Sequence, residues 1–315
     1  MNSRTWLFRL ILTQMMLLCA AAVALAQTDS LRTEDDDDDD STMSGIAFTK
    51  RGMKFSTGGK ATIKEFTLRF EYGSGGVRLN DATLSPGPLR FAEIHAGNES
   101  FSPLSKTKSV MRYTHDGLFG GVFGNDMLGV RRDSTTFGLS GWRWGYRSTS
   151  GFAYTNDEGT PRLGLLHTGG LVWTYLSTQS AADPTAQPQS ATEYPRYAAF
   201  TNSVLGSHTG ATVRYGFGGV GITLNYQRTL MFNNYSFWGW IGSGMIEGLS
   251  QTLLTQLIEK QLRTSPRTMP VANLLLRSAL SFAFYQLRRN SQHFPFGGNT
   301  PLEFNQVTAG VNIAF

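Results

Sequence analysis

The chain has 315 residues, a formal net charge of +5 and a single cysteine, Cys19. One cysteine excludes a disulfide framework, so burial or a backbone hydrogen-bond network must hold the fold together. A net positive charge can favour binding to nucleic acid. The export signal described next argues against that partner and favours lipopolysaccharide phosphates or small anionic solutes.

Residues 1–26 have the pattern of a secretory signal peptide, which we expect to be cleaved. Two arginines precede an apolar stretch over 10–23, and a small-x-small cleavage site ends at Ala26. The stretch is shorter than the roughly 18 residues that a membrane-spanning helix needs. An uncleaved anchor and a lipoprotein modified at Cys19 are the alternatives. Cleavage after Ala26 would remove the only cysteine.

Residues 27–44 are predicted to form an acidic, disordered tail. Six consecutive aspartates, Asp35–Asp40, dominate it, and such a run repels itself rather than packing. Capture of Ca²⁺ is the alternative, but the run lacks the spacing and the glycine of a calcium-binding loop. We therefore predict a solvated tail in the periplasm, followed by one domain over residues 45–315.

From about residue 61 onward, apolar residues recur at every second position, which is the period of a β-strand. One face of the clearest segments carries no formal charge, whereas the other carries small and polar residues with a few charges. A lipid-facing wall and a wet, crowded interior give a membrane barrel this alternation, although a soluble sandwich also alternates. The clearest segments are 66–72, 211–217, 220–226, 274–284 and 307–315.

We predict an all-β fold, a closed antiparallel transmembrane β-barrel of about 10–12 strands. A single-chain bacterial barrel has an even number of strands, and the ring must close because lipid offers no partner for an open edge. Aromatic residues at strand ends agree with interfacial girdles, although β-propensity alone also enriches them. The further predicted strands are 76–84, 89–97, 109–123, 135–146, 150–155, 162–176, 197–206 and 232–241.

Turns and one helical pattern complete the organisation. Gly218-Gly219 predicts a tight hairpin on the periplasmic side, and the polar segments 177–196 and 288–300 suit long outer loops. Residues 245–262 predict one short amphipathic helix. Counting strands back from the C-terminus places it on the periplasmic side. There it would seal the base of the barrel or, as the functional alternative, plug the lumen or dock a partner.

The last nine residues alternate regularly and end in phenylalanine. The apolar positions are Val307, Ala309, Val311, Ile313 and Phe315. This segment resembles the C-terminal strand of bacterial outer-membrane β-barrel proteins, a porin-like class. The resemblance implies that the segment is the signal read by the barrel-assembly machinery and that the protein resides in the outer membrane. It implies no particular activity.

The sequence contains only weak matches to cofactor-binding, metal-binding and catalytic motifs. Residues 216–221 match the G-x-G-x-x-G dinucleotide pattern, but a strand follows them instead of the helix that such a site needs. The five histidines show no metal-binding spacing. Ser207 and His208 are neighbours in a predicted strand and so point to opposite faces, which makes them poor partners for catalysis. We expect no catalytic, metal or cofactor site and no enzymatic activity.

Strand parity places five polar side chains toward the lumen: Arg69, Glu71, Arg214, Asn225 and Arg277. Their excess positive charge would favour anions, so the leading hypothesis is a passive or weakly anion-selective pore. One alternative is a non-conducting structural or adhesion barrel, in which the arginines pair internally and fill a lumen too narrow to conduct. Another is a lipid-modifying enzyme, which would need a Ser/His/acid cluster.

Overall fold

The computed structural model describes fourteen segments of the chain. They are residues 45–49, 52–56, 62–79, 86–104, 109–125, 127, 138–157, 159–179, 195–217, 219–232, 236–261, 267–290, 293–296 and 300–315. These segments belong to one compact unit, Gly45–Phe315. The predicted signal peptide (1–26) and acidic tail (27–44) lie outside the described residues.

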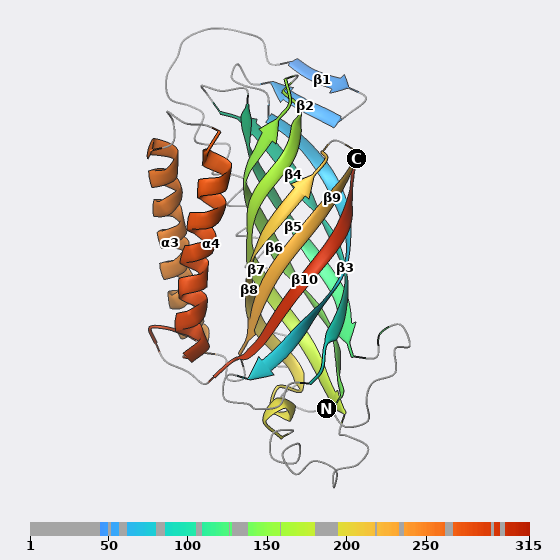
Figure 1. Cartoon of the computed structure of the whole chain (residues 1–315), viewed down its shortest axis with the longest axis vertical. Helices are drawn as coiled ribbons and strands as arrows, with labels where there is room; N and C mark the ends of the chain where they lie inside the picture. The colour runs from blue at the N-terminus through green and yellow to red at the C-terminus, as the bar shows by residue number, and fades with distance from the viewer. Residues whose placement is uncertain are drawn as a thin grey trace. The chain divides into compact units, whose positions relative to one another are not determined.

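Eight antiparallel strands close into a barrel (Figure 1). Each strand pairs with the next along the chain, and the last pairs with the first, so the predicted closed antiparallel barrel is confirmed. The strands are β3 (Thr62–Leu79), β4 (Leu89–Pro103), β5 (Val110–Gly124), β6 (Gly138–Thr155), β7 (Pro161–Gln179), β8 (Asn202–Tyr215), β9 (Val220–Met231) and β10 (Leu302–Ala314).

The ring has fewer strands than the 10–12 predicted. Two further strands, β1 (Gly45–Thr49) and β2 (Gly52–Ser56), extend the sheet to ten beside β3 without entering the ring. Several predicted strands are parts of one longer strand, because the glycines between them do not form turns. A Cβ atom at Gly73 would collide with the carbonyl oxygen of Val307. Glycine there permits the close approach of β3 to β10.

Two helices fill the connection between β9 and β10. They are α3 (Phe237–Gln261) and α4 (Met269–Asn290), whereas the sequence predicted one helix over 245–262. The strand predicted at 274–284 is wrong, because this segment lies inside α4. It has no glycine and no β-branched residue, and its leucines and alanines are strong helix formers. None of the helices in the described part of the chain has the length and hydropathy to span a membrane.

The position predicted for the helix is also wrong. Three short connections, 104–109, 156–160 and 216–219, lie at the same end of the barrel as the C-terminus, which we call the short-turn end. The helices belong to the longest connection, 232–301, at the opposite, long-connection end. The miscount followed from treating residues 274–284 as a strand.

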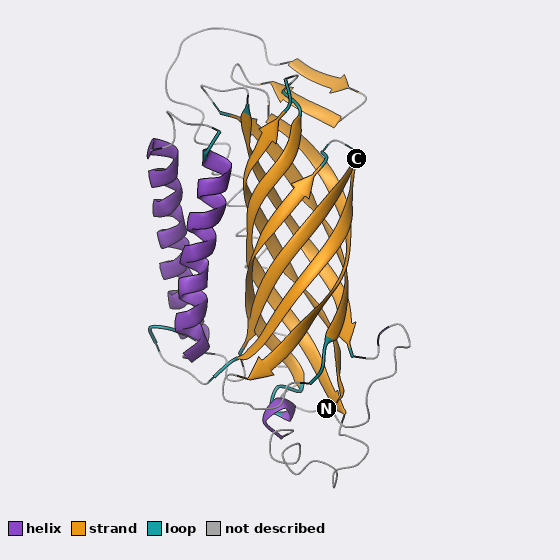
Figure 2. Ribbon diagram, viewed as in Figure 1, coloured by secondary structure: helices purple, strands orange, loops and turns teal. Residues whose placement is uncertain are grey.

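The helices form a hairpin that lies along the outside of the barrel (Figure 2). It packs against β6, β7 and β8, with α4 making most of the contacts. Near the short-turn end, the hydroxyl of Tyr154 in β6 donates a hydrogen bond to the carbonyl oxygen of Arg267 at 2.8 Å. Near the other end, Tyr285 in α4 donates to Glu303 in β10 at 2.8 Å.

The alternation predicted from the sequence appears as two surfaces. Outward side chains that the hairpin leaves uncovered are mostly apolar and exposed, whereas inward side chains are buried and include most of the polar ones. The exposed apolar side chains of the wall include Phe66, Phe70, Tyr72, Ile94, Leu118, Val122, Trp142, Tyr175, Val213, Tyr215, Val220, Ile222, Leu224, Tyr226, Val307 and Val311.

Candidate functional site: the barrel interior and a cavity on its outer wall

Four of the five predicted lumen residues point into the barrel. Arg69, Glu71, Arg214 and Asn225 are all buried there. Arg277 does not join them, which corrects its predicted place. It lies on α4, outside the barrel, and donates a hydrogen bond to the Ser150 hydroxyl at 2.8 Å.

One group of side chains crosses the lumen between opposite strands. Arg214 of β8 forms an ion pair with Glu99 of β4, and these strands lie four positions apart in a ring of eight. Arg214 also donates to the Tyr113 hydroxyl at 2.9 Å, and Tyr113 donates to Glu99 at 3.0 Å. Because the contact joins opposite walls, these side chains block the centre of the barrel.

A second crossing lies at another level. Arg143 and Arg147 of β6 both pair with Glu93 of β4. Arg143 also donates to Gln306 of β10, the strand opposite β6. Arg147 reaches Gln227 of β9 at 3.0 Å. The interior is therefore a connected network of arginine, carboxylate and amide groups, and buried charges are stable only when paired in this way.

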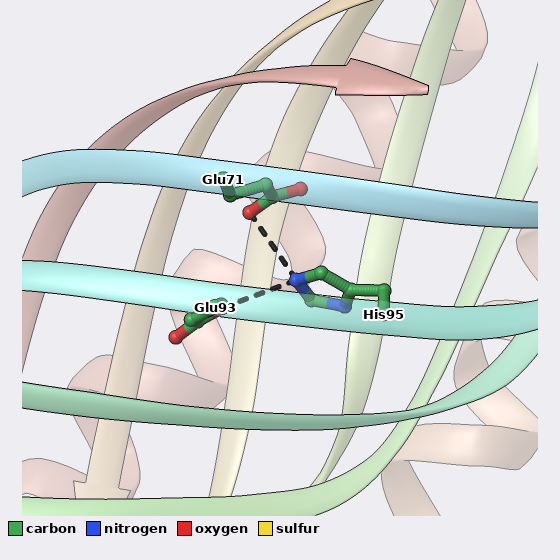
Figure 3. Close-up of side chains that lie close together, drawn as sticks. All are labelled: Glu71, Glu93 and His95. Atoms are coloured by element: carbon green, nitrogen blue, oxygen red, sulfur yellow. Dashed lines mark ion pairs between the residues drawn. The ribbon is translucent and has the colours of Figure 1, made fainter. Parts of the chain in front are cut away.

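Three side chains in this network could coordinate a cation: Glu71, Glu93 and His95 (Figure 3). The Nε2 atom of His95 lies 3.4 Å from Glu71 Oε2 and 3.2 Å from Glu93 Oε2. However, Arg147 contacts both carboxylates, at 3.4 and 3.0 Å. Guanidinium groups already neutralise these carboxylates, so the geometry fits an ion-pair network better than a metal centre.

Apolar layers cover the polar network toward both mouths. Near the short-turn end, Phe101, Tyr113 and Leu166 are buried together, with Phe217 packed against them. The cluster near the long-connection end is larger and includes the short helical turn at 195–198. Its members are Val77, Leu79, Leu89, Phe91, Phe123, Leu139, Leu176, Tyr197, Phe200, Val204, Met231, Leu302 and Phe304. Side chains thus fill the barrel from end to end.

The interior charges are close to balance. Among the described residues, four buried arginines (69, 143, 147 and 214) share the lumen with three buried glutamates (71, 93 and 99). The positive excess that favoured an anion pore in the sequence is therefore small. The glutamates at 93 and 99 fell outside the segments whose parity was compared.

A cavity of about 550 Å³ lies between the hairpin and the outer wall of β6–β9. Both of its walls contribute polar side chains. The barrel contributes outward residues such as Ser150, His167 and Thr209, and the helices contribute Gln251 and Ser281. Ser207 also faces this cavity, whereas its neighbour His208 is buried in the lumen against Phe119.

Regular spacing on each helix produces the polar lining. Ser243, Glu247 and Gln251 are four residues apart on α3, a spacing that places them on one face. Arg277, Ser281 and Arg288 line the cavity from α4. Arg288 pairs with Glu247 at 2.5 Å and donates to the Ser243 hydroxyl at 2.9 Å, which joins the two helices.

The lining of the cavity includes a serine–histidine contact that the sequence did not reveal. The hydroxyl of Ser281 lies 2.8 Å from Nε2 of His167. The two residues are 114 positions apart, and only the docking of α4 on β7 brings them together. The sequence does contain one signal of this contact, the polar residues at every fourth position of α3, because a polar helix face has to pack against other polar groups.

The chain matches no protein-family model and no curated protein. The functional argument therefore depends on the geometry of the barrel and of its outer wall.

Proposed function

We propose that the chain is an outer-membrane β-barrel whose lumen is closed, so that it acts through its outer wall and loops and not as a pore. The observation that carries this proposal is the pair of contacts between opposite strands, Arg214 with Glu99 and Arg143 with Gln306. Eight-stranded barrels have an interior that side chains just fill, and wide aqueous channels occur at about 16–18 strands.

Two features support the membrane location. The exposed apolar side chains around the barrel would face hydrocarbon, where they satisfy the requirement for an uncharged surface. The strand that ends at Phe315 resembles the assembly signal of outer-membrane barrels, so the barrel-assembly machinery and outer-membrane lipid, including lipopolysaccharide, are the partners we propose. The non-conducting barrel replaces the anion-selective pore as the leading hypothesis because the arginines of the lumen are paired.

Recordings from planar lipid bilayers test the proposal. Purified full-length protein should produce no conductance steps across the salt and voltage range in which a 16-stranded porin, measured in parallel, conducts. Stable single-channel openings by the unmodified protein would overturn the closed-lumen proposal, and an anion preference among them would restore the pore hypothesis.

A further inference from the structure

The cavity on the outer wall has the dimensions and the chemistry of a ligand site. Its volume of about 550 Å³ lies within the range of about 300–1,000 Å³ that is usual for small-molecule pockets. Apolar side chains, among them Leu171, Leu230, Phe232 and Trp240, line the part near the long-connection end. An acyl chain could lie against them.

Charged side chains line the same cavity and favour an anionic ligand. Arg228, Arg277 and Arg288 contribute three positive charges, and Glu247 contributes one negative charge. Arg288 and Glu247 neutralise each other at 2.5 Å. Arg228 and Arg277 remain to attract an anionic head group, with no other carboxylate among the described residues that line the cavity.

The hydrogen bonds around Ser281 orient its hydroxyl proton. Nε of Arg277 donates to Gln251 Oε1 at 3.2 Å, and a guanidinium can only donate. The amide oxygen of Gln251 therefore faces Arg277, and its NH₂ group donates to Ser281 Oγ at 2.7 Å. Since the serine oxygen accepts from Gln251, its own proton is available to His167.

The acceptor for that proton is Nε2 of His167, at 2.8 Å. Two other groups lie farther away. The Thr209 hydroxyl is 3.3 Å from the same nitrogen, and Glu247 Oε1 is 3.5 Å from Ser281 Oγ. The other carboxylate oxygen of Glu247 binds Arg288. His167 is thus the base nearest to the hydroxyl, within the distance that proton transfer requires.

We infer that Ser281 and His167 form a nucleophile–base pair that hydrolyses a fatty-acyl ester of an anionic amphiphile. Ser281 Oγ attacks the ester carbonyl carbon while His167 Nε2 takes the hydroxyl proton. The carbon–oxygen bond to the head group then breaks, and His167 returns the proton to the leaving oxygen. Water then attacks the acyl carbon while His167 Nε2 takes its proton, and this proton passes to Ser281 Oγ as the acyl–serine bond breaks and the fatty acid leaves. Gln251, which donates to Ser281 Oγ, and Arg277, which donates to Gln251, would donate to the oxyanion.

A fluorophosphonate probe tests the nucleophile directly. The full-length protein in detergent micelles should be labelled covalently, and mass spectrometry of its peptides should place the label on Ser281. His167→Gln should slow labelling by about 100-fold or more, the usual contribution of a general base. The matched control is Ser278→Ala, in the same helix but outside the cavity lining, which should be labelled like the unmodified protein.

Assays with two different substrates identify the source of the ester. Fatty-acid release is measured from mixed micelles of an anionic phospholipid and, separately, from purified lipopolysaccharide. The inference is supported if the unmodified protein releases fatty acid from one of these substrates and both Ser281→Ala and His167→Gln abolish that release with unchanged circular dichroism spectra. The substrate that is cleaved identifies the source of the ester. No label on Ser281 in folded protein, or release that persists in both variants, overturns it. Because these assays need no conductance, their failure would leave the closed-lumen proposal standing.

Discussion

The barrel has two kinds of outer wall, and the comparison between them explains the role of the helices. The bare wall, formed by β10, β3 and the part of β9 outside the cavity, exposes apolar side chains such as Phe70, Leu224 and Val311. The covered wall, on β6–β8 under the hairpin, presents Ser150 and His167 and other polar groups at the same outward positions. Polar outward residues are therefore concentrated under the helices, and β4 and β5 add exposed ones such as Asn98 and Asp116.

The hairpin repeats the pattern of the bare wall on its own far side. Met245, Leu249 and Leu253 lie four residues apart on α3 and are each more than half exposed. Leu275 of α4 is similarly exposed. The hairpin thus turns its polar stripe to the barrel and an apolar surface outward, so that barrel and hairpin together present one apolar exterior. The polar side chains of β6–β8 that line the cavity thus lie behind an apolar surface that the hairpin supplies.

Removing the hairpin should destabilise the covered wall more than any other change. Replacing residues 233–299 by a short glycine-rich turn would leave His167, Ser150 and Glu303 without their helical partners. Each buried polar group left unsatisfied costs about 1–3 kcal/mol, so the loss should exceed that of any substitution below. Urea unfolding in lipid vesicles measures it. A truncated barrel as stable as the full chain would show that the hairpin does not stabilise the covered wall.

A cation placed on the bare wall should destabilise the barrel more than a cation placed on the covered wall. Leu224→Arg puts a cation on the bare wall and should lower the free energy of unfolding in vesicles by about 2–4 kcal/mol. The matched variant is Ser148→Arg, which faces the cavity and lies opposite Asp116 in the β5–β6 register. It should cost less than about 1 kcal/mol, since an opposite charge is adjacent. Equal costs for the two variants would remove the distinction between the walls.

Substitutions in the buried apolar contact between hairpin and barrel should lower stability more than substitutions on the exposed helix surface. Ile258 of α3 is buried with Val110, Phe152 and Met269. Ile258→Ala should cost about 2 kcal/mol, at the low end for a buried isoleucine. Leu249→Ala, on the exposed side, is the control and should change the urea midpoint little. If Leu249→Ala lowered the stability more than Ile258→Ala, the opposite face of α3 would be the one that packs against the barrel.

The smallest effect is expected where a single hydrogen bond ties the hairpin to the wall. Tyr154→Phe removes the donor to the Arg267 carbonyl oxygen and should cost about 0.5 kcal/mol, since the bond is exposed. Faster proteolysis between α3 and α4, with an unchanged barrel, is the expected readout. An unchanged cleavage rate would mean that this bond does not restrain the hairpin.

Much of the barrel was predictable because strand parity is a local property. Alternation at 66–72, 220–226 and 307–315 identified true outward and inward faces. The predicted strand count is too high because the glycine-rich stretches inside β3 resemble strand boundaries, although they serve close strand packing.

The helices and the cavity were less predictable. Residues 274–284 alternate in hydropathy by coincidence, while their leucines and alanines favour a helix. Arg277 was consequently placed in the lumen. The contact between Ser281 and His167 depends on how α4 docks on β7, which no local pattern encodes. The pairing of Arg214 with Glu99 likewise joins strands that are distant in sequence, so the charge of the lumen could not be read from parity alone.

The most direct test of the account asks what the bare wall touches. Single cysteines at Leu224 and at the buried lumen residue Thr212, in a Cys19→Ser background, are spin-labelled and reconstituted in lipid vesicles. The label at position 224 should collide often with dissolved oxygen and rarely with an aqueous nickel chelate, and the label at 212 should collide rarely with both. Frequent collisions of the 224 label with the nickel chelate would show water at that wall and contradict the account.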